Sequence, residues 1–311
     1  MNVTDLAAWD LFVAVAERGS FTAAARARGL SVATVSRAVA ALEARLGAPL
    51  LHRTSRRLSL SPLGEEALAQ ARALLTEARC LEERLSDQAT TAGGRIRLAA
   101  PLEFGQRHVA PLLSSFLQQY PDIGIDLDLD DRTVDLVGSG HDLALRIGHL
   151  ADSSLIARRL CPVERFVVAA PAYLARHGRP AVPADLVRHR CLVYANSERP
   201  GLWRFAGADG DDIAIDVEGP LAVNSGATIE TALVAGLGIA MLPDFLVAAS
   251  IASSAVEALL PGWRTPTLGL YLLTPPGRHR PKRVQLLMEH LAAALGRPSW
   301  RRAALRAAPE G

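Results

Sequence analysis

The stretch from Ser31 to Arg37 carries small and hydroxyl side chains where a core helix would carry bulky apolar ones. Short hydroxyl and methyl groups can contact polar base edges and thymine methyls in a DNA major groove, and an arginine can reach a guanine edge or a phosphate. The stretch therefore has the chemistry of a groove-reading surface. The alternative is that Ser31 only caps the helix and that the other side chains are simply exposed. The candidate DNA contacts are Thr22, Ser31, Val32, Ala33, Thr34, Ser36 and Arg37.

Basic residues are concentrated around this stretch. Residues 1–62 hold eight arginines and four acidic residues, residues 63–94 hold three arginines and six acidic residues, and the whole chain has a net charge of only +2. The excess favours an anionic partner for the first segment, and a solvated basic surface is the alternative. A second group has a spacing that suits backbone phosphates or the minor groove: Arg53, Thr54, Ser55, Arg56 and Arg57.

No pattern of catalytic or metal-binding residues is found in the sequence. The eight histidines have no i, i+4 pairing, no Gly-x-Ser-x-Gly motif occurs, and no clustered carboxylates suggest a metal site or an acid–base pair. Cys80, Cys161 and Cys191 lack metal-ligand spacing, which favours three inert thiols, with a redox switch built from Cys161 and Cys191 as the alternative. We expect no enzyme, no metal and no cofactor. An enzyme on a two-lobed α/β fold is the competing function.

Periodicity and capping residues place the groove-reading stretch on the second of two adjacent helices. After a first amphipathic helix that Gly19 ends, Ser20 is placed to cap a helix over residues 22–28, and Ser31 to cap another that runs to about Leu46. Two short helices so close together are typical of a helix-turn-helix, whose second member lies in the major groove. Alternating residues at 56–61 predict a short strand, which would form a wing.

A long helix is predicted from Pro62 to about Gln88, followed by a hinge-like linker at residues 90–94. Its apolar residues follow the spacing of a coiled-coil seam, for which a second copy of the same helix is the simplest partner. A packing face used within one chain is the alternative. The seam residues are Ala67, Ala71, Leu74, Ala78, Leu81 and Leu85.

The remaining residues predict a two-lobed α/β domain. Short strands at "RIRLAA", "IGIDLDLD", "HDLALRIG", "RFVVAA" and "CLVY" alternate with helical patterns such as residues 109–120 and 229–235. This alternation predicts a mostly parallel sheet in each lobe. Open α/β sheets bind ligands beyond the carboxyl ends of their strands, so we expect a ligand cleft between the lobes.

Four segments of the sequence carry a resemblance to a known family. The segment "LFVAVAERGSFTAAARARGLSVATVSRAVAALEARLGAPLLHRTSRRLSLSPLGEEAL" resembles, nearly residue for residue in pattern, the N-terminal domain of the LysR-type transcriptional regulators. The segments "RIRLAAP" and "DLALRIG" and the later "VNSGATIETALVAGLGIAMLPDFL" are similar to that family in layout. The resemblance covers residues 6 to about 294.

The resemblance implies an overall α/β fold class with a winged helix-turn-helix over residues 1–62, a dimerising linker helix and hinge over 63–94, and an effector-binding domain over 95–311. That domain would have the periplasmic-binding-protein-like fold, with lobe I at residues 95–161 and 268–298 and lobe II at residues 162–267. The implied partners are double-stranded DNA, a small-molecule effector, a homodimer or homotetramer of this chain, and RNA polymerase. Neither a signal peptide nor a membrane span is recognisable in the sequence, so we expect a cytoplasmic protein that has no membrane partner.

The family places its small ligand between the lobes, and the matching positions here are the candidate effector contacts. Helix N-termini at Leu102 and Ser225 would offer free N–H groups to a carboxylate, and Arg132 or Arg146 could complete its charge. A scaffold pair of Arg146 with Asp142 is the alternative. The candidates are Pro101, Leu102, Arg132, Thr133, Arg146, Ile147, Gly148, Asn196, Asn224 and Ser225.

The chain departs from the family pattern at both sites. Many members have glutamine where Val32 stands, so a polar base reader is missing here. Many also have serine or threonine at the positions of Pro101 and Leu102, so an effector would have fewer hydroxyl contacts in this chain.

Overall fold

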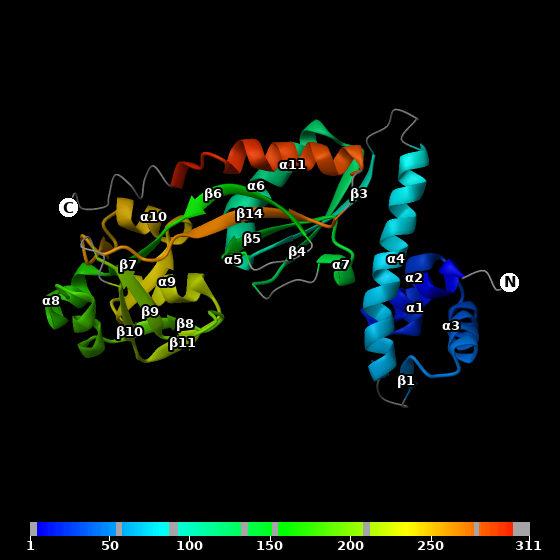
Figure 1. The fold of residues 1–311 in the computed structure, drawn as a ribbon, viewed down its shortest axis with the longest axis horizontal. Helices are drawn as coiled ribbons and strands as arrows, with labels where there is room; N and C mark the ends of the chain where they lie inside the picture. The colour runs from blue at the N-terminus through cyan, green and yellow to red at the C-terminus, as the bar shows by residue number, and fades with distance from the viewer. Residues whose placement is uncertain are drawn as a thin grey trace.

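The computed structural model describes residues 5–53, 58–86, 93–131, 136–150, 155–207, 212–276 and 280–300. Its N-terminal unit comprises three helices, a two-stranded wing and a long helix (Figure 1). These elements are α1 (Leu6–Arg18), α2 (Phe21–Arg28), α3 (Val32–Leu46), β1 (Leu51–Arg53), β2 (Leu58–Leu60) and α4 (Pro62–Ser86).

Local capping sets the bounds of the first three helices. The side chains of Ser20 and Ser31 each accept a hydrogen bond from the backbone N–H three residues on, which confirms both as N-caps. Gly29, at a φ of 65°, ends α2 in the left-handed conformation that glycine adopts without strain. The three helices bury a common core that includes Phe12, Val15, Val35, Val39 and Leu42, all fully buried.

The wing is fixed to both neighbouring helices. Strand β1, which the sequence pattern did not predict, pairs antiparallel with β2. The Glu43 carboxylate of α3 accepts hydrogen bonds from the backbone N–H groups of Leu50 and Leu51, at 2.9 and 3.0 Å. At the start of α4, a Cβ on Gly64 would lie 2.0 Å from the carbonyl oxygen of Leu50, so only glycine fits there.

The apolar face of α4 is only partly buried within the chain. Ala71 is buried against the core of the N-terminal helices, so this part of the seam packs within the chain. Leu74, one turn further on, is 43% exposed. The side chains of Leu81 and Leu85 lie outside the described part of the structure.

The first lobe is built on a five-stranded sheet. Its strand order is β4 (Ile123–Leu129), β3 (Gly94–Ala100), β5 (Leu143–Gly148), β14 (Leu268–Thr274) and β6 (Ile156–Val163). Strand β3 leads into a short helix, a π-helical turn and a longer helix, which are α5 (Leu102–Phe104), η1 (Gly105–Val109) and α6 (Ala110–Gln119). Helix α7 (Leu136–Ser139) contacts α4, and α11 (Lys282–Leu295) packs beside α6 (Figure 1).

The second lobe has its own five-stranded sheet. Its order is β11 (Leu221–Val223), β8 (Cys191–Tyr194), β12 (Ile239–Pro243), β7 (Arg165–Ala169) and β13 (Glu257–Ala258). Two helices pack against it, α9 (Gly226–Val234) and α10 (Asp244–Ala252). The lobe is completed by α8 (Pro171–His177), the 3₁₀ helix η2 (Pro183–Arg188) and a hairpin of β9 (Leu202–Ala206) and β10 (Asp212–Asp216).

The prediction of mostly parallel sheets is wrong. Each sheet combines two parallel and two antiparallel pairings. The cause is the path of the chain, which passes from the first sheet to the second between Val163 and Arg165 and returns at Leu268. Strands β7 and β14, which follow these crossings, run against their neighbours.

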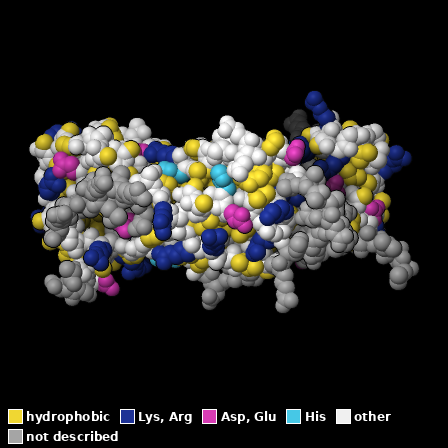
Figure 2. Space-filling model, turned by 90° about the horizontal axis from the view of Figure 1, so that it is seen from above, with side chains coloured by type: hydrophobic (Ala, Val, Ile, Leu, Met, Phe, Trp, Pro, Cys, Tyr) yellow, Lys and Arg dark blue, Asp and Glu magenta, His cyan; other side chains and the backbone are white. Residues whose placement is uncertain are grey.

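The surface view in Figure 2 shows one long face of the molecule, on which charged and hydrophobic side chains are interspersed. Among the residues that the structure describes, no helix combines the length and the apolar character that crossing a membrane requires.

Candidate DNA interface and effector cleft

The exposed face of α3 is the candidate DNA interface. Ser31, Val32, Ala33 and Arg37 are exposed, Thr34 and Ser36 are partly buried, and the opposite face packs into the core. The Ser31 and Thr34 hydroxyls hydrogen-bond to each other at 2.8 Å. The Arg37 Nε donates to the Ala33 carbonyl oxygen at 3.3 Å, which lays the guanidinium along the helix. Thr22 is exposed on α2.

The basic residues near this face differ in how available they are. Arg28 is held by two hydrogen bonds of 2.7 Å to the carboxylate of Asp10, so its charge is already paired. Arg53 ends β1, but its side chain lies outside the described part, as do Thr54, Ser55, Arg56 and Arg57.

A cavity of about 650 Å³ lies between the two lobes. Of the candidate effector contacts, five line it and three do not; Arg132 and Thr133 lie outside the described residues. The lining residues are Pro101, Arg146, Ile147, Gly148 and Asn196, whereas Leu102, Asn224 and Ser225 are not part of the lining.

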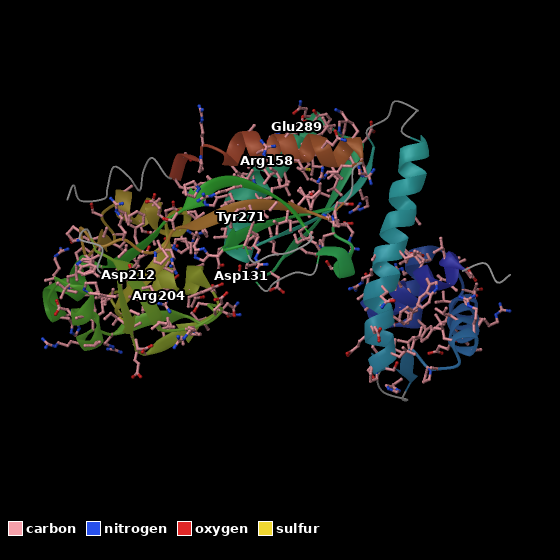
Figure 3. All side chains as sticks on the ribbon, viewed as in Figure 1. Asp131, Arg158, Arg204, Asp212, Tyr271 and Glu289 are labelled. Atoms are coloured by element: carbon pink, nitrogen blue, oxygen red, sulfur yellow. The ribbon has the colours of Figure 1, made fainter. Side chains whose placement is uncertain are left out.

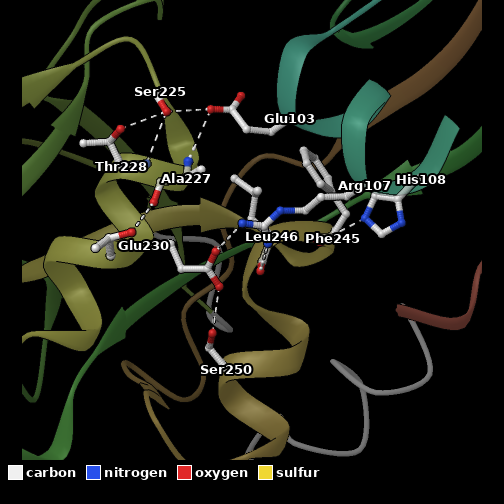
Figure 4. A network of polar contacts seen from close by, with 11 residues as sticks. Glu103, Arg107, His108, Ser225, Ala227, Thr228, Glu230, Phe245, Leu246 and Ser250 are labelled. Carbon is white, nitrogen blue, oxygen red and sulfur yellow. Dashed lines mark hydrogen bonds and ion pairs between the residues drawn. The ribbon is translucent and has the colours of Figure 1, made fainter. Parts of the chain in front are cut away.

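Both helix N-termini that were expected to bind a carboxylate already hold a carboxylate of this chain. Glu103 crosses from the first lobe to α9, where its Oε1 accepts hydrogen bonds from the Ser225 hydroxyl at 2.9 Å and from the Ala227 N–H at 3.3 Å (Figure 4). The Leu102 N–H donates to Asp131 Oδ1 at 3.0 Å. These N–H groups are therefore satisfied without a ligand.

Sequence reasoning did not single out Glu103, although it is only 6% exposed and lines the cleft. Glu103 is the acidic residue of the loop "PLEFG", and this was its only signal in the sequence. No neighbouring residue indicates that its side chain reaches a helix of the other lobe. Asp131 was missed because its partner, the Leu102 N–H, is 29 positions away in the sequence.

Burial shifts the pKa of two side chains that line the cleft, Asp131 and Tyr194. Burial raises the pKa of Asp131 even though the Leu102 N–H stabilises its charged form. Burial, together with the neighbouring Asp131, also raises the pKa of Tyr194, whose hydroxyl hydrogen-bonds to that carboxylate. In Figure 3, Asp131 is labelled on the first lobe and Arg204 on β9 of the second.

Further polar contacts join the lobes beside the cleft (Figure 4). Arg107 donates to Glu230 Oε2 at 2.6 Å and to the Leu246 carbonyl oxygen at 3.2 Å. The His108 Nε2 lies 3.1 Å from the carbonyl oxygen of Phe245, which requires that this nitrogen carry the proton. Burial lowers the pKa of His108.

Other reactive side chains in the described residues lie away from the cleft. Asp128, His141 and Ser139 form a hydrogen-bonded chain with two contacts of 2.6 Å, and none of the three lines the cleft. Cys161 and Cys191 are buried and neither is in a disulfide, and burial raises the pKa of Cys191 to about 12, which keeps its thiol protonated. No group of three or more metal-ligating side chains occurs among the residues described.

Comparison with known proteins agrees with this architecture. Residues 6–65 match the family model for the bacterial regulatory helix-turn-helix protein of the lysR family, and residues 89–296 match that for the LysR substrate binding domain. The chain is 40% identical over 295 residues to the HTH-type transcriptional regulator PtxR of Pseudomonas aeruginosa, covering 93% of each chain.

Solved structures of full-length regulators are also similar. The virulence activator AphB of Vibrio cholerae is 29% identical with a TM-score of 0.66, over 94% of this chain and 100% of that one. The regulator CrgA of Neisseria meningitidis is 30% identical with a TM-score of 0.60, over 95% and 100%. With an N-terminal helix-turn-helix and a C-terminal effector-binding domain, the chain belongs to the LysR family of transcriptional regulators.

Proposed function

We propose that this chain regulates transcription as a dimer or a dimer of dimers, and that an organic anion bound in the cleft changes how paired α3 helices engage DNA. The observation that carries the proposal is the exposed face of small residues on α3, backed by a buried apolar underside. A helix of this kind can approach base edges closely, because no bulky side chain keeps it away.

The proposed DNA contacts divide into two classes. Ala33 and Thr34 would face base edges. The guanidinium of Arg37 would turn away from α3 to reach a guanine edge or a phosphate. Arg53 and the wing residues that follow it would contact phosphates, which position the protein and carry no sequence information directly.

The proposed coupling runs from the cleft to the DNA through the two lobes and α4. An effector can shift this equilibrium only if it binds one arrangement of the molecule more tightly than the other. The contact between α4 and α7 of the first lobe supports a physical route between the cleft and the DNA-binding unit. The proposal places the protein in the cytoplasm with double-stranded DNA as its partner, and an activator would in addition contact RNA polymerase.

Two arginine variants test the two classes of DNA contact. A duplex selected by the wild-type chain from a random-sequence library is titrated at several salt concentrations, beside an unselected duplex. Arg37→Ala should lower affinity for the selected duplex by about 5- to 100-fold and relax preference at one position. Arg53→Ala should weaken binding to both duplexes by a similar factor and reduce the salt slope by about one.

Arg204→Ala serves as the control, because Arg204 is an exposed arginine on the second lobe. If Arg37→Ala and Arg53→Ala bind both duplexes as this control does, α3 and the wing are not the DNA-binding surface.

A further inference from the structure

Arg165 lies at the point where the chain first enters the second lobe, and it lines the cleft. Its Nη2 donates to the carbonyl oxygen of Pro266 at 3.3 Å, close to the point where the chain returns to the first lobe. Its Nε is buried and has no hydrogen-bond partner among the described residues. The guanidinium is thus held at the junction of the lobes, and its one hydrogen bond within the described ranges is that to Pro266.

This cation also lacks a counter-charge. Within the described ranges it forms no ion pair, and burial lowers the pKa of Arg165 because the surroundings disfavour the charged form. Removing a cation from water without pairing it destabilises a fold. Such an arrangement is expected where a protein gives up stability for a binding site.

The other positive features of the cleft are compensated. Arg146 already has an interaction partner, and Arg199 and Arg204 are exposed to water, which screens their charge. The N-terminus of α9 holds Glu103. An incoming anion therefore gains most at Arg165.

We propose that Arg165 anchors the carboxylate of a monocarboxylate effector whose apolar body lies in the cleft. This inference rests on the proposed function, because it names the ligand class and the anchor of the same cleft. The end of the guanidinium, where Nη1 and Nη2 carry the remaining N–H groups, can meet a carboxylate with two parallel hydrogen bonds. Apolar side chains are available in the same lining for the body of the ligand, namely Trp203, Met241, Leu242, Phe245 and Leu268.

Acidic residues in the lining disfavour a second negative charge on the ligand. Glu103, Asp130 and Asp131 all line the cleft. A dicarboxylate would place its second carboxylate among these acids, and like charges brought together disfavour binding. The geometry thus selects one carboxylate on an apolar body.

Thermal unfolding of the full chain with matched probes tests the anchor. Benzoate and hexanoate are compared with terephthalate, adipate and neutral benzamide, with ionic strength held constant by sodium chloride. Benzoate or hexanoate should raise the Tm of the wild type, and the dicarboxylates and the amide should raise it less. Arg165→Met should lose this shift and, without ligand, should have a Tm no lower than the wild type. Arg165→Lys, which keeps the charge and loses the planar edge, should retain only part of the shift.

Arg158→Met is the matched control, because Arg158 is exposed on β6 and does not line the cleft. The anchor is overturned if Arg165→Met keeps the shift, or if its ligand-free Tm falls below those of the wild type and the control, as expected of an arginine needed only for its bond to Pro266. If benzamide protects the wild type as well as benzoate does, the anchor fails while a small-molecule cleft remains. If no probe protects, the anchor also fails, and the DNA titrations above judge the proposed function separately.

Discussion

At the scale of single residues, Glu103 determines where an anion can bind in the cleft. Its carboxylate occupies the N-terminus of α9, the place that otherwise attracts negative charge. An effector carboxylate that displaced Glu103 would leave a buried carboxylate without partners, which costs about 1–3 kcal/mol or more. An anionic effector is therefore directed to another part of the cleft.

A second residue-scale consequence concerns His108 and pH. Because burial lowers the pKa of His108, the unfolded chain takes up a proton at a higher pH than the native chain does. The contribution of His108 to the free energy of unfolding is thus fully present above the ordinary histidine pKa of about 6.5 and is lost as the pH falls below it. Lowering the pH from about 7.5 to about 5.5 should therefore reduce the free energy of unfolding of the wild type more than that of His108→Gln.

Urea denaturation at a series of pH values measures this difference. The control is His177→Gln, since His177 is exposed on α8. A wild-type-minus-variant difference that changes with pH no more for His108 than for His177 would contradict the burial argument.

At the scale of elements, the sequence predicts best what neighbouring residues determine. The caps at Ser20 and Ser31 and the length of α4 follow from local hydrogen bonding and periodicity, and the structure has them within one or two residues. The antiparallel direction of β7 and β14 was not predicted, because crossings between lobes set it. The contact of Glu103 with α9 joins residues more than a hundred positions apart, so no local pattern encodes it.

The divided seam of α4 leads to a prediction about assembly. Leu74 is exposed, whereas Ala71 is used within the chain, so contact with a second copy would begin near Leu74. Leu74→Glu should place an unpaired charge in that contact and raise the dimer dissociation constant by about tenfold or more. Sedimentation equilibrium measures the constant.

Gln70→Glu adds the same charge to an exposed position of α4 that lies off the seam. If the dimers of Leu74→Glu and Gln70→Glu dissociate at the same protein concentration, this part of α4 does not form the dimer interface.

At the scale of the whole molecule, contacts join the two lobes to each other and the first lobe to α4. Arg107 and Glu103 reach from the first lobe to α9 and α10 of the second, next to the cavity. The first lobe in turn contacts α4 through α7. In the proposed function, an effector that shifts one lobe against the other would rearrange contacts on the path to α3.

The most direct test of this account is the footprint and affinity of the full chain on its selected duplex, with and without the monocarboxylate that raises its Tm most. We predict that the ligand changes the length of the footprint or the affinity for wild type and for Arg158→Met, and changes neither for Arg165→Met. Identical footprints and affinities with and without a ligand of demonstrated binding to the wild type would contradict the claim that the cleft controls how this protein engages DNA.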